Sequence, residues 1–207
     1  MVDVDWDERY QGAPDNRPWD IGTVEPELKR CIEKDLANEK LQRALEIGCG
    51  TGTNSIWLAE RGIDTLGTEI SPTAIAAAEK KIAGAKLPVR FVEHDIVATA
   101  PVQPGSIDFV FDRGVFHVMG AAQRGPFVKH VAQSLRDGGW WLCLAGSKDE
   151  TKPEDRGPPR WSASELLSAV ELEFEVHSLE RSFFELPDGS RYAAWRALFK
   201  RRAGTSI

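Results

Sequence analysis

One stretch decides the fold of this chain: Glu46-Ile47-Gly48-Cys49-Gly50-Thr51-Gly52. It follows a short apolar run at 44–47 and precedes residues 53–60, whose apolar spacing is typical of a helix. Glycines between a strand and a helix let the backbone turn tightly and let a ligand approach the backbone N–H groups. In open parallel sheets, ligands bind at the carboxyl ends of the strands, where this loop lies. The stretch therefore predicts a parallel sheet and a ligand site together.

The acid that ends the next apolar run supports this interpretation. Glu69 closes the run 63–69 and lies 21 residues after Gly48. A carboxylate at that place can accept hydrogen bonds from both hydroxyls of a ribose. The dinucleotide motif G-x-G-x-x-G would need glycine at position 53, where the chain has Thr53. We therefore expect a cofactor that contains a nucleoside, bound by a loop with the spacing E-x-G-x-G-x-G.

The rest of the chain alternates apolar runs with helical patterns. We expect parallel strands at 44–47, 63–69, 89–93, 107–111 and 140–145, and helices after Pro26 and at 53–60, 72–82 and 125–135. A further short helix is expected to begin at the capping box Ser162-Ala163-Ser164-Glu165. Asp137-Gly138-Gly139 is expected to end the fourth of these helices. Two alternating runs, 172–179 and 192–199, flank Pro187-Asp188-Gly189, which predicts an antiparallel hairpin. The fold class is therefore α/β: a doubly wound, mostly parallel, seven-stranded, Rossmann-like sheet with a C-terminal antiparallel hairpin.

Composition excludes several classes of protein. The chain has 207 residues, 42% of them hydrophobic and 28% charged, with a net charge of −6. This composition argues against disorder, and the negative charge gives no footprint for nucleic acid or for an anionic membrane. The length predicts one domain, 1–207. No apolar run approaches the roughly 20 residues of a membrane span, and the acidic start does not resemble a secretory leader.

The three cysteines are Cys31, Cys49 and Cys143. They are too few and too scattered for a disulfide framework or a zinc site, so we expect free thiols and no bound metal. A small number of unpaired cysteines is typical of proteins in a reducing compartment, so we expect a cytoplasmic setting.

Taken in order, the motifs resemble those of the class I S-adenosylmethionine-dependent methyltransferases. The stretch 46–52 is similar to that family's first motif, Gly67-Thr68-Glu69-Ile70-Ser71 to its acidic second, and Glu93-His94-Asp95-Ile96 to its third. The resemblance implies that the glycines face the methionine part of S-adenosyl-L-methionine, the second motif its ribose and the third its adenine. The cofactor-binding residues that it implies are Trp19, Glu46, Gly48, Cys49, Gly50, Glu69, Ile70, Asp95, Ile96 and Arg113.

Three further segments narrow the resemblance. An N-terminal arm with Trp6 to Tyr10 and Pro18-Trp19-Asp20-Ile21-Gly22, then Phe111-Asp112-Arg113-Gly114, then Gly157-Pro158-Pro159, look like the thiopurine, thiol and halide methyltransferases and their tellurite-resistance relatives. Those enzymes methylate soft, polarisable nucleophiles. The resemblance implies an extended arm, 1–24, that closes over the cofactor with Trp19 against it. It also implies a cofactor-binding core at 25–146 and a substrate-side loop, helix and hairpin at 147–207.

The acceptor site is expected after the fourth and fifth strands. Methyl transfer is an in-line displacement in which alignment supplies much of the rate, and a thiolate needs no strong base. Candidate substrate contacts are Phe116, His117, Trp161 and Phe184, and candidate catalytic residues are His117 and Asp112. Plainer roles stay open for several of these residues: a packed or solvated His117, an Arg113 that only ties loops together, and Phe183 and Phe184 as core.

The function predicted from the sequence is transfer of a methyl group from S-adenosyl-L-methionine to a small soft nucleophile, which we expect to be a thiol. Alternatives are O- or N-methylation of a small metabolite, a non-catalytic protein that binds the cofactor, and a nicotinamide-dependent oxidoreductase. The expected partner is a small-molecule methyl acceptor, with no nucleic acid and no membrane, and the chain is expected to be a monomer or homodimer.

Overall fold

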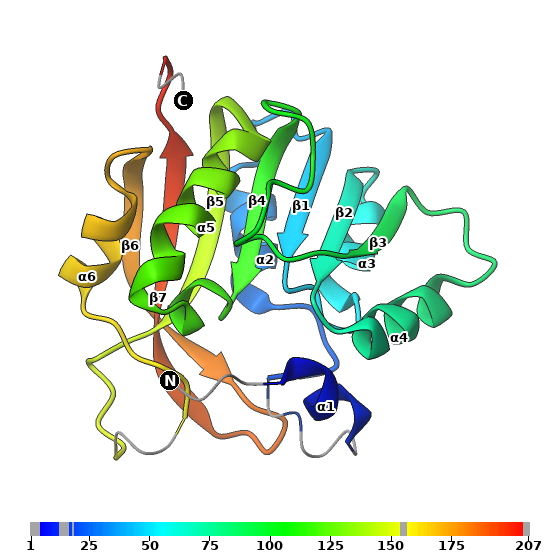
Figure 1. The fold of residues 1–207 in the computed structure, drawn as a ribbon, viewed down its shortest axis with the longest axis horizontal. Helices are drawn as coiled ribbons and strands as arrows, with labels where there is room; N and C mark the ends of the chain where they lie inside the picture. Colours follow the sequence, from blue (N-terminus) through cyan, green and yellow to red (C-terminus); the bar gives the residue numbers. More distant parts are fainter. Residues whose placement is uncertain (1–4, 13–16, 18, 154–156, 205–207) are drawn as a thin grey trace.

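The computed structural model describes residues 5–12, 17, 19–153 and 157–204 and is built around one sheet (Figure 1). The order of the strands is β3-β2-β1-β4-β5-β7-β6. Their bounds are β1 Arg43–Ile47, β2 Asp64–Glu69, β3 Val89–Glu93, β4 Ile107–Arg113, β5 Leu135–Gly146, β6 Phe174–Glu185 and β7 Arg191–Arg201. Strands β1 to β5 are parallel, while β7 runs antiparallel to both β5 and β6. The predicted seven-stranded, mostly parallel sheet with a closing hairpin is confirmed.

Helices cover both faces of the sheet. They are α1 Trp6–Gln11, α2 Pro26–Arg30, continued by the π-helix Cys31–Asp35, α3 Thr53–Ala59, α4 Pro72–Ile82, α5 Ala121–Ser134 and α6 Ala163–Val170, with a 3₁₀ turn at Phe116–Val118. In Figure 1, α5 and α6 lie in front of the sheet and α2 and α3 behind it. One apolar cluster packs under α5 and α6 around Trp141, and a second packs under α2 and α3 around Phe109. Both clusters exclude water from the sheet, and this burial is the main stabilisation of such a fold.

The topology fixes where a ligand can bind. Strand β1 pairs with β2 on one side and with β4 on the other, so the direction of winding reverses at β1. The carboxyl ends of β1 to β5 share the lower edge of the sheet in Figure 1. Ligands of open α/β sheets bind at such a reversal, outside the carboxyl ends of the strands.

The hairpin is longer than predicted and shifted along the sequence. The first strand of the hairpin begins at Phe174 and not at Leu172, which lies before β6 and is 81% exposed. Phe184 is buried, but Phe183 is 43% exposed, because neighbouring residues of a strand point to opposite faces. The expectation that both rings are core is therefore wrong for Phe183. Trp140 and Trp141, in β5, are both buried.

Two local predictions are also wrong. The arm is not extended throughout, because residues 6–11 form helix α1, whose N-terminus is capped by the Asp5 carboxylate. Asp137-Gly138-Gly139 does not separate a helix from a strand, since it lies inside β5. The pairing of β5 with β4 shifts register between Ile107 and Phe109, so the extra residues of β5, glycines included, are accommodated as an irregularity of the strand.

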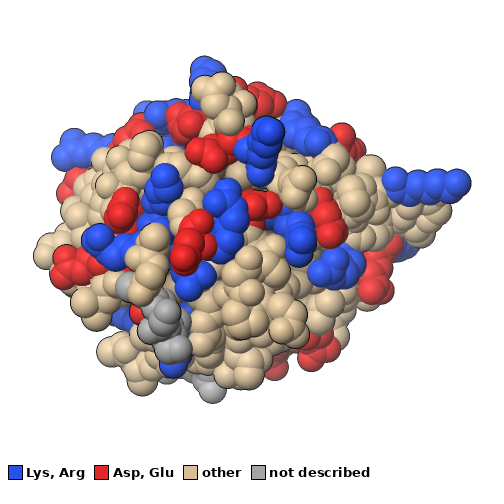
Figure 2. Space-filling view, turned by 90° about the horizontal axis from the view of Figure 1, so that it is seen from above, with Lys and Arg blue, Asp and Glu red and all other residues tan. Residues whose placement is uncertain are grey.

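The three cysteines are free, as expected, and all three are buried. None of the helices in the described part of the chain has the length and apolarity that crossing a bilayer requires. Figure 2 shows the face that lies at the top of Figure 1, opposite the carboxyl ends of the parallel strands. Basic and acidic side chains are interspersed over it, and no area of a single charge stands out.

Candidate active site

The glycine loop joins β1 to α3 with three residues in the left-handed region of φ. Gly48, Gly50 and Gly52 have φ of 66°, 53° and 80°. A Cβ on Gly48 would lie 2.3 Å from Cγ2 of Val115, and one on Gly50 would lie 2.7 Å from the hydroxyl oxygen of Tyr10. Only glycine tolerates both this backbone conformation and these close approaches. The loop is therefore shaped so that other groups lie directly against its backbone.

Glu69 ties the ends of β1 and β2 together. The Gly50 N–H donates to its Oε2 (3.1 Å), and the N–H groups of Ile70 and Ser71 donate to its Oε1 (2.7 and 3.2 Å). Burial raises the pKa of this carboxyl, and the three N–H donors oppose that shift. A carboxylate held so firmly at the end of β2 is preorganised to accept hydrogen bonds from a diol.

Apolar residues follow the ends of β2 and β3 beside this carboxylate. Ile70 is 46% exposed although it is aliphatic, and Ile96 is buried after β3. Asp95 is exposed, and its Oδ1 accepts a hydrogen bond from the Val97 N–H (2.8 Å). The predicted contacts for methionine, ribose and adenine thus follow one another along β1, β2 and β3, in the order of the sheet. Their individual roles remain predictions.

A hollow of about 70 Å³ lies between the glycine loop and the arm. Glu46, Cys49 and Arg113 line it, as do Tyr10, Trp19, Asp20, Ile21, Thr23, Glu25, Gly48, Gly50, Thr51, Thr53 and Asn54. The Glu46 carboxylate is buried and accepts hydrogen bonds from Asn54 Nδ2 (2.9 Å) and Ser55 Oγ (2.5 Å). Burial raises the pKa of Glu46 to about 7. This hollow combines carboxylates with a guanidinium, which suits a ligand that carries both an ammonium and a carboxylate.

The N-terminal arm closes the hollow from outside the sheet. Trp19 Nε1 donates to the hydroxyl of Tyr10 (3.1 Å), and the rings of Trp6 and Trp19 meet edge to face with centroids 5.6 Å apart. Asp7 fastens the arm to α4, since its Oδ1 accepts from Ser71 Oγ (2.6 Å) and the Thr73 N–H (2.9 Å). Pro18, part of the motif that suggested the arm, lies outside the described residues.

Arg113, at the end of β4, joins three segments at the rim of the hollow. Its Nε donates to Glu25 (2.5 Å), and its other nitrogens donate to the carbonyl oxygens of Trp19 (3.0 Å) and Glu185 (3.2 Å). The arm, the start of α2 and the end of β6 are thereby held together. Arg113 lines the hollow, as the cofactor prediction requires, and it also ties loops together.

Asp112 holds the turn after β4 rather than facing the hollow. Its Oδ1 accepts from the N–H groups of Val115 (3.1 Å) and Phe116 (3.0 Å), and its Oδ2 accepts from Trp141 Nε1 (3.0 Å). The side chain is fully buried, and burial raises its pKa to about 6. Both oxygens are engaged by the protein itself, so this placement does not support the predicted catalytic role and indicates a positioning role.

His117 lies beyond this turn, between the ends of β4 and β5. The Gly146 N–H donates to its Nδ1 (2.8 Å), and its ring meets that of Phe184 edge to face at 5.6 Å. The side chain is 5% exposed, and burial, aided by the charge of Arg113, lowers its pKa to about 3. His117 is therefore neutral across the physiological range.

The aromatic candidates divide between core and site. Phe116 is fully buried and packs against Phe127, Trp141 and Trp161. Trp161 is also buried, and its Nε1 donates to the carbonyl oxygen of His117 (3.2 Å). Rings enclosed in this way cannot touch a soluble acceptor in this conformation, so the structure does not support either as a direct contact. Both side chains are more deeply buried than residues that follow strand ends were expected to be.

Phe184 remains at the site. The guanidinium of Arg113 lies over its ring at 5.0 Å from the centroid, and the imidazole of His117 meets its edge. Phe184 thus forms a wall between the end of β4 and the hairpin. Its predicted role as a substrate contact is compatible with this placement and is not tested by it.

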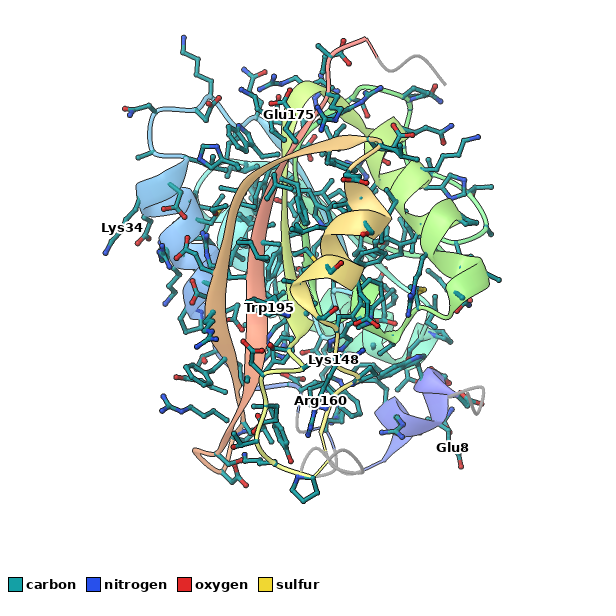
Figure 3. All side chains as sticks on the ribbon, turned by 90° about the vertical axis from the view of Figure 1, so that its left-hand side faces the viewer. Glu8, Lys34, Lys148, Arg160, Glu175 and Trp195 are labelled. Carbon is teal, nitrogen blue, oxygen red and sulfur yellow. The ribbon has the colours of Figure 1, made fainter. Side chains whose placement is uncertain are left out.

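The segment between β5 and α6 covers the same edge. In Figure 3, the labelled side chains of Lys148 and Arg160 lie at the end of the molecule where Glu8 marks α1. A Cβ on Gly146 would lie 2.2 Å from the Pro159 carbonyl oxygen, so the segment passes directly over the end of β5. Beyond it, a larger hollow of about 610 Å³ opens between residues 149–152 and the tip of the hairpin.

Several residues of the site have no strong sequence signal of their own. Tyr10, Glu25 and Asn54 line the hollow, and the Glu25 N–H donates to Asn54 Oδ1 (2.9 Å). Glu25 caps the start of α2, and its ion pair with Arg113 joins residues that are far apart in the chain.

The comparisons with known proteins fit this geometry. The sequence model of the thiopurine S-methyltransferase (TPMT) family matches residues 1–196. The chain is 28% identical to 2-heptyl-1-hydroxyquinolin-4(1H)-one methyltransferase of Mycobacteroides abscessus over 163 residues, 78% of this chain and 70% of that protein. It is also 28% identical to probable thiol methyltransferase 2 of Arabidopsis thaliana, over 84% of this chain and 75% of that protein.

Solved structures share the fold. A structure described under "Conversion of a Disulfide Bond into a Thioacetal Group during Echinomycin Biosynthesis" superposes with a TM-score of 0.82 at 24% identity, covering 97% of this chain and 93% of that one. TehB from Haemophilus influenzae superposes with a TM-score of 0.68 at 20% identity, over 86% of this chain and 62% of that one. These similarities reach along nearly the whole sheet.

Proposed function

Since the chain belongs to the thiopurine S-methyltransferase family, and is thus an S-adenosylmethionine-dependent methyltransferase, we propose that it methylates the sulfur of a small thiol. When bound, S-adenosyl-L-methionine supplies a methyl group on a positively charged sulfur; the acceptor sulfur gains that methyl group, and S-adenosylhomocysteine remains as a neutral thioether. The chain's own residues bind, align and shield the two partners, which is where such a transfer gains most of its rate.

The residues of the glycine edge fit this cofactor. Glu69 accepts hydrogen bonds from the ribose hydroxyls, and Ile70 supplies an apolar surface for the adenine. Glu46 and Arg113, which both line the small hollow, match the ammonium and the carboxylate of the methionine part. Trp19 closes the hollow with an aromatic face, which is favourable toward a sulfonium cation.

The observation that carries the choice of a thiol is the state of the two candidate bases. Asp112 has both oxygens bound by backbone and indole N–H groups, and His117 accepts an N–H at Nδ1. Neither is arranged to take a proton from an acceptor. A thiol ionises more readily than an alcohol or a phenol, and its anion is a strong nucleophile, so a thiol depends on such a base less than these oxygen acceptors do.

A second candidate is O-methylation of a hydroxylated nitrogen heterocycle. The similarity to 2-heptyl-1-hydroxyquinolin-4(1H)-one methyltransferase, over 78% of this chain, supports it. An acidic N-hydroxyl group would also reach the site ionised, so it meets the same requirement.

A panel of matched acceptors tests the proposal. The purified protein is given S-adenosyl-L-methionine and either thiophenol, phenol or a 1-hydroxyquinolin-4-one. Release of S-adenosylhomocysteine is measured, and the products are identified by mass spectrometry. We expect turnover of thiophenol and at most trace turnover of phenol. Methylation of the hydroxyquinolone without any thiol turnover would replace the first candidate by the second.

A further inference from the structure

The hydrogen bonds around His117 indicate a role that differs from proton removal. We propose that His117 donates a hydrogen bond from Nε2 to the anionic sulfur of the acceptor, which therefore binds as a thiolate. This inference rests on the proposed function and specifies how the acceptor is held.

The position of the proton on the ring follows from a single contact. A backbone N–H can only donate, and the Gly146 N–H points at Nδ1 from 2.8 Å. Nδ1 must therefore carry a lone pair, and a neutral imidazole then carries its hydrogen on Nε2. A ring in this tautomer offers an N–H at Nε2 and has no free lone pair with which to act as a base.

The space in front of Nε2 is kept open by a glycine. A Cβ on Gly114 would lie 3.1 Å from His117 Nε2 and 3.9 Å from the Phe184 ring. Gly114 has φ of 78°, so a side chain there would also be strained. Among the described residues, Nε2 has no hydrogen-bond partner; the side chain is only 5% exposed, but Nε2 itself is not fully enclosed by the protein. A donor that the protein leaves unpaired in a mostly buried side chain is available to a ligand that supplies the acceptor.

The sheet places this donor on the acceptor side of the cofactor. The predicted nucleoside contacts occupy β1, β2 and β3, whereas His117 lies between the ends of β4 and β5, on the other side of β1. Val115, in the same turn, lies against Gly48 of the glycine loop. A molecule beside Nε2 is therefore next to the methionine end of the cofactor site.

The charge around the ring suits an anion. Arg113, from β4, is the charged residue that acts on His117, and its guanidinium lies over the same Phe184 ring that the imidazole contacts. A thiolate beside Nε2 would accept the N–H and lie on the side of this guanidinium, whose Nε is paired with Glu25. The proton of the thiol is lost to solvent before binding, so the site selects acceptors whose thiol is already ionised.

Two substitutions separate donation from base catalysis. In the His117→Gln variant, the side-chain amide reaches the position of Nε2 and presents an N–H donor there. In the His117→Asn variant, the side-chain oxygen lies near the position of Nδ1 and accepts from the Gly146 N–H, but no donor reaches the position of Nε2. Neither can act as a base. We expect kcat/KM for thiophenol to stay within about 3-fold in the Gln variant and to fall about 10- to 100-fold in the Asn variant. Equal large losses in both would overturn the proposal.

The pH dependence gives a second readout. With a series of thiophenols of different acidity, the midpoint of kcat/KM against pH is expected to move with the pKa of each thiol. A midpoint near neutrality that is common to all thiols, and that disappears in both variants, would assign His117 as a base instead.

The tautomer itself can be measured without any acceptor. In protein labelled with ¹⁵N at histidine, the spectrum of His117, assigned with the Gln variant, is expected to show an Nε2–H imidazole from about pH 5 to about pH 9. A proton on Nδ1, or titration of the ring in this range, would refute the inference. If no thiol is methylated but this spectrum is observed, the choice of a thiol fails and the donor assignment stands.

Discussion

Replacing Glu46 by Gln removes a buried negative charge and leaves the packing almost unchanged. The Gln oxygen can accept from Asn54 Nδ2, and its amide can donate to the Ser55 hydroxyl, so both partners of the carboxylate are retained. Burial raises the pKa of Glu46 from 4.5 to about 7. Only the titration of this group is therefore expected to change.

The sign and size follow from linkage. Between pH 4.5 and about 7 the folded protein binds this proton more tightly than the unfolded chain does, so the free energy of unfolding falls as the pH rises through this range. At about 1.36 kcal/mol per pKa unit, the difference between 4.5 and 7 corresponds to about 3 kcal/mol. The Glu46→Gln variant lacks this loss, so relative to the wild type it is expected to gain up to about 3 kcal/mol between acidic and mildly alkaline pH.

Urea unfolding at about pH 5 and about pH 8 measures this change. Glu79→Gln, on the exposed face of α4, is the control and should show no change with pH relative to the wild type. If the stability difference between Glu46→Gln and the wild type changes by less than about 0.5 kcal/mol between the two pH values, the carboxyl does not titrate as the burial implies.

Two further predictions concern the loop and the arm. Gly52→Ala should lower the melting temperature well below that of Gly62→Ala: both have strongly positive φ (80° and 79°), but only a Cβ on Gly52 would meet a neighbour, Phe91 at 2.6 Å. In each variant the backbone strain is expected to lower the free energy of unfolding by about 1 to 2 kcal/mol. Overpacking against Phe91 should lower it by about 1 to 3 kcal/mol more in Gly52→Ala. Equal melting temperatures of the two variants would contradict this close packing. Asp7→Asn weakens the hydrogen bonds that hold the arm to α4, so S-adenosylhomocysteine should dissociate several-fold faster in stopped-flow experiments. The control Glu8→Gln, at an exposed position of the same helix, should dissociate as the wild type does. Unchanged dissociation in Asp7→Asn would mean that the aromatic contacts alone hold the arm.

The cofactor edge was predictable from the sequence because its determinants are local. The loop 48–52 directly follows β1, and Glu69 is the last residue of β2. Because these strands are parallel, their carboxyl ends lie at one edge of the sheet. The spacing of these residues along the chain therefore translates directly into their order along the sheet.

The acceptor side was less predictable, because its determinants are contacts between distant residues. Phe116 and Trp161 follow strand ends just as pocket residues do, and only the packing of α5 and α6 encloses them. The state of His117 is set by the N–H of Gly146 on the next strand, and Tyr10 reaches the glycine loop from the arm. Nothing in the neighbouring sequence of these residues specifies such partners.

Calorimetric titration with S-adenosylhomocysteine tests most directly whether the cofactor lies across the ends of β1 to β3. We expect one site per chain, an affinity at least about 10-fold weaker in Glu69→Gln, and no change in the control Glu79→Gln. Absence of binding to the wild type, or equal affinity for the wild type and Glu69→Gln, would contradict the position assigned to the cofactor.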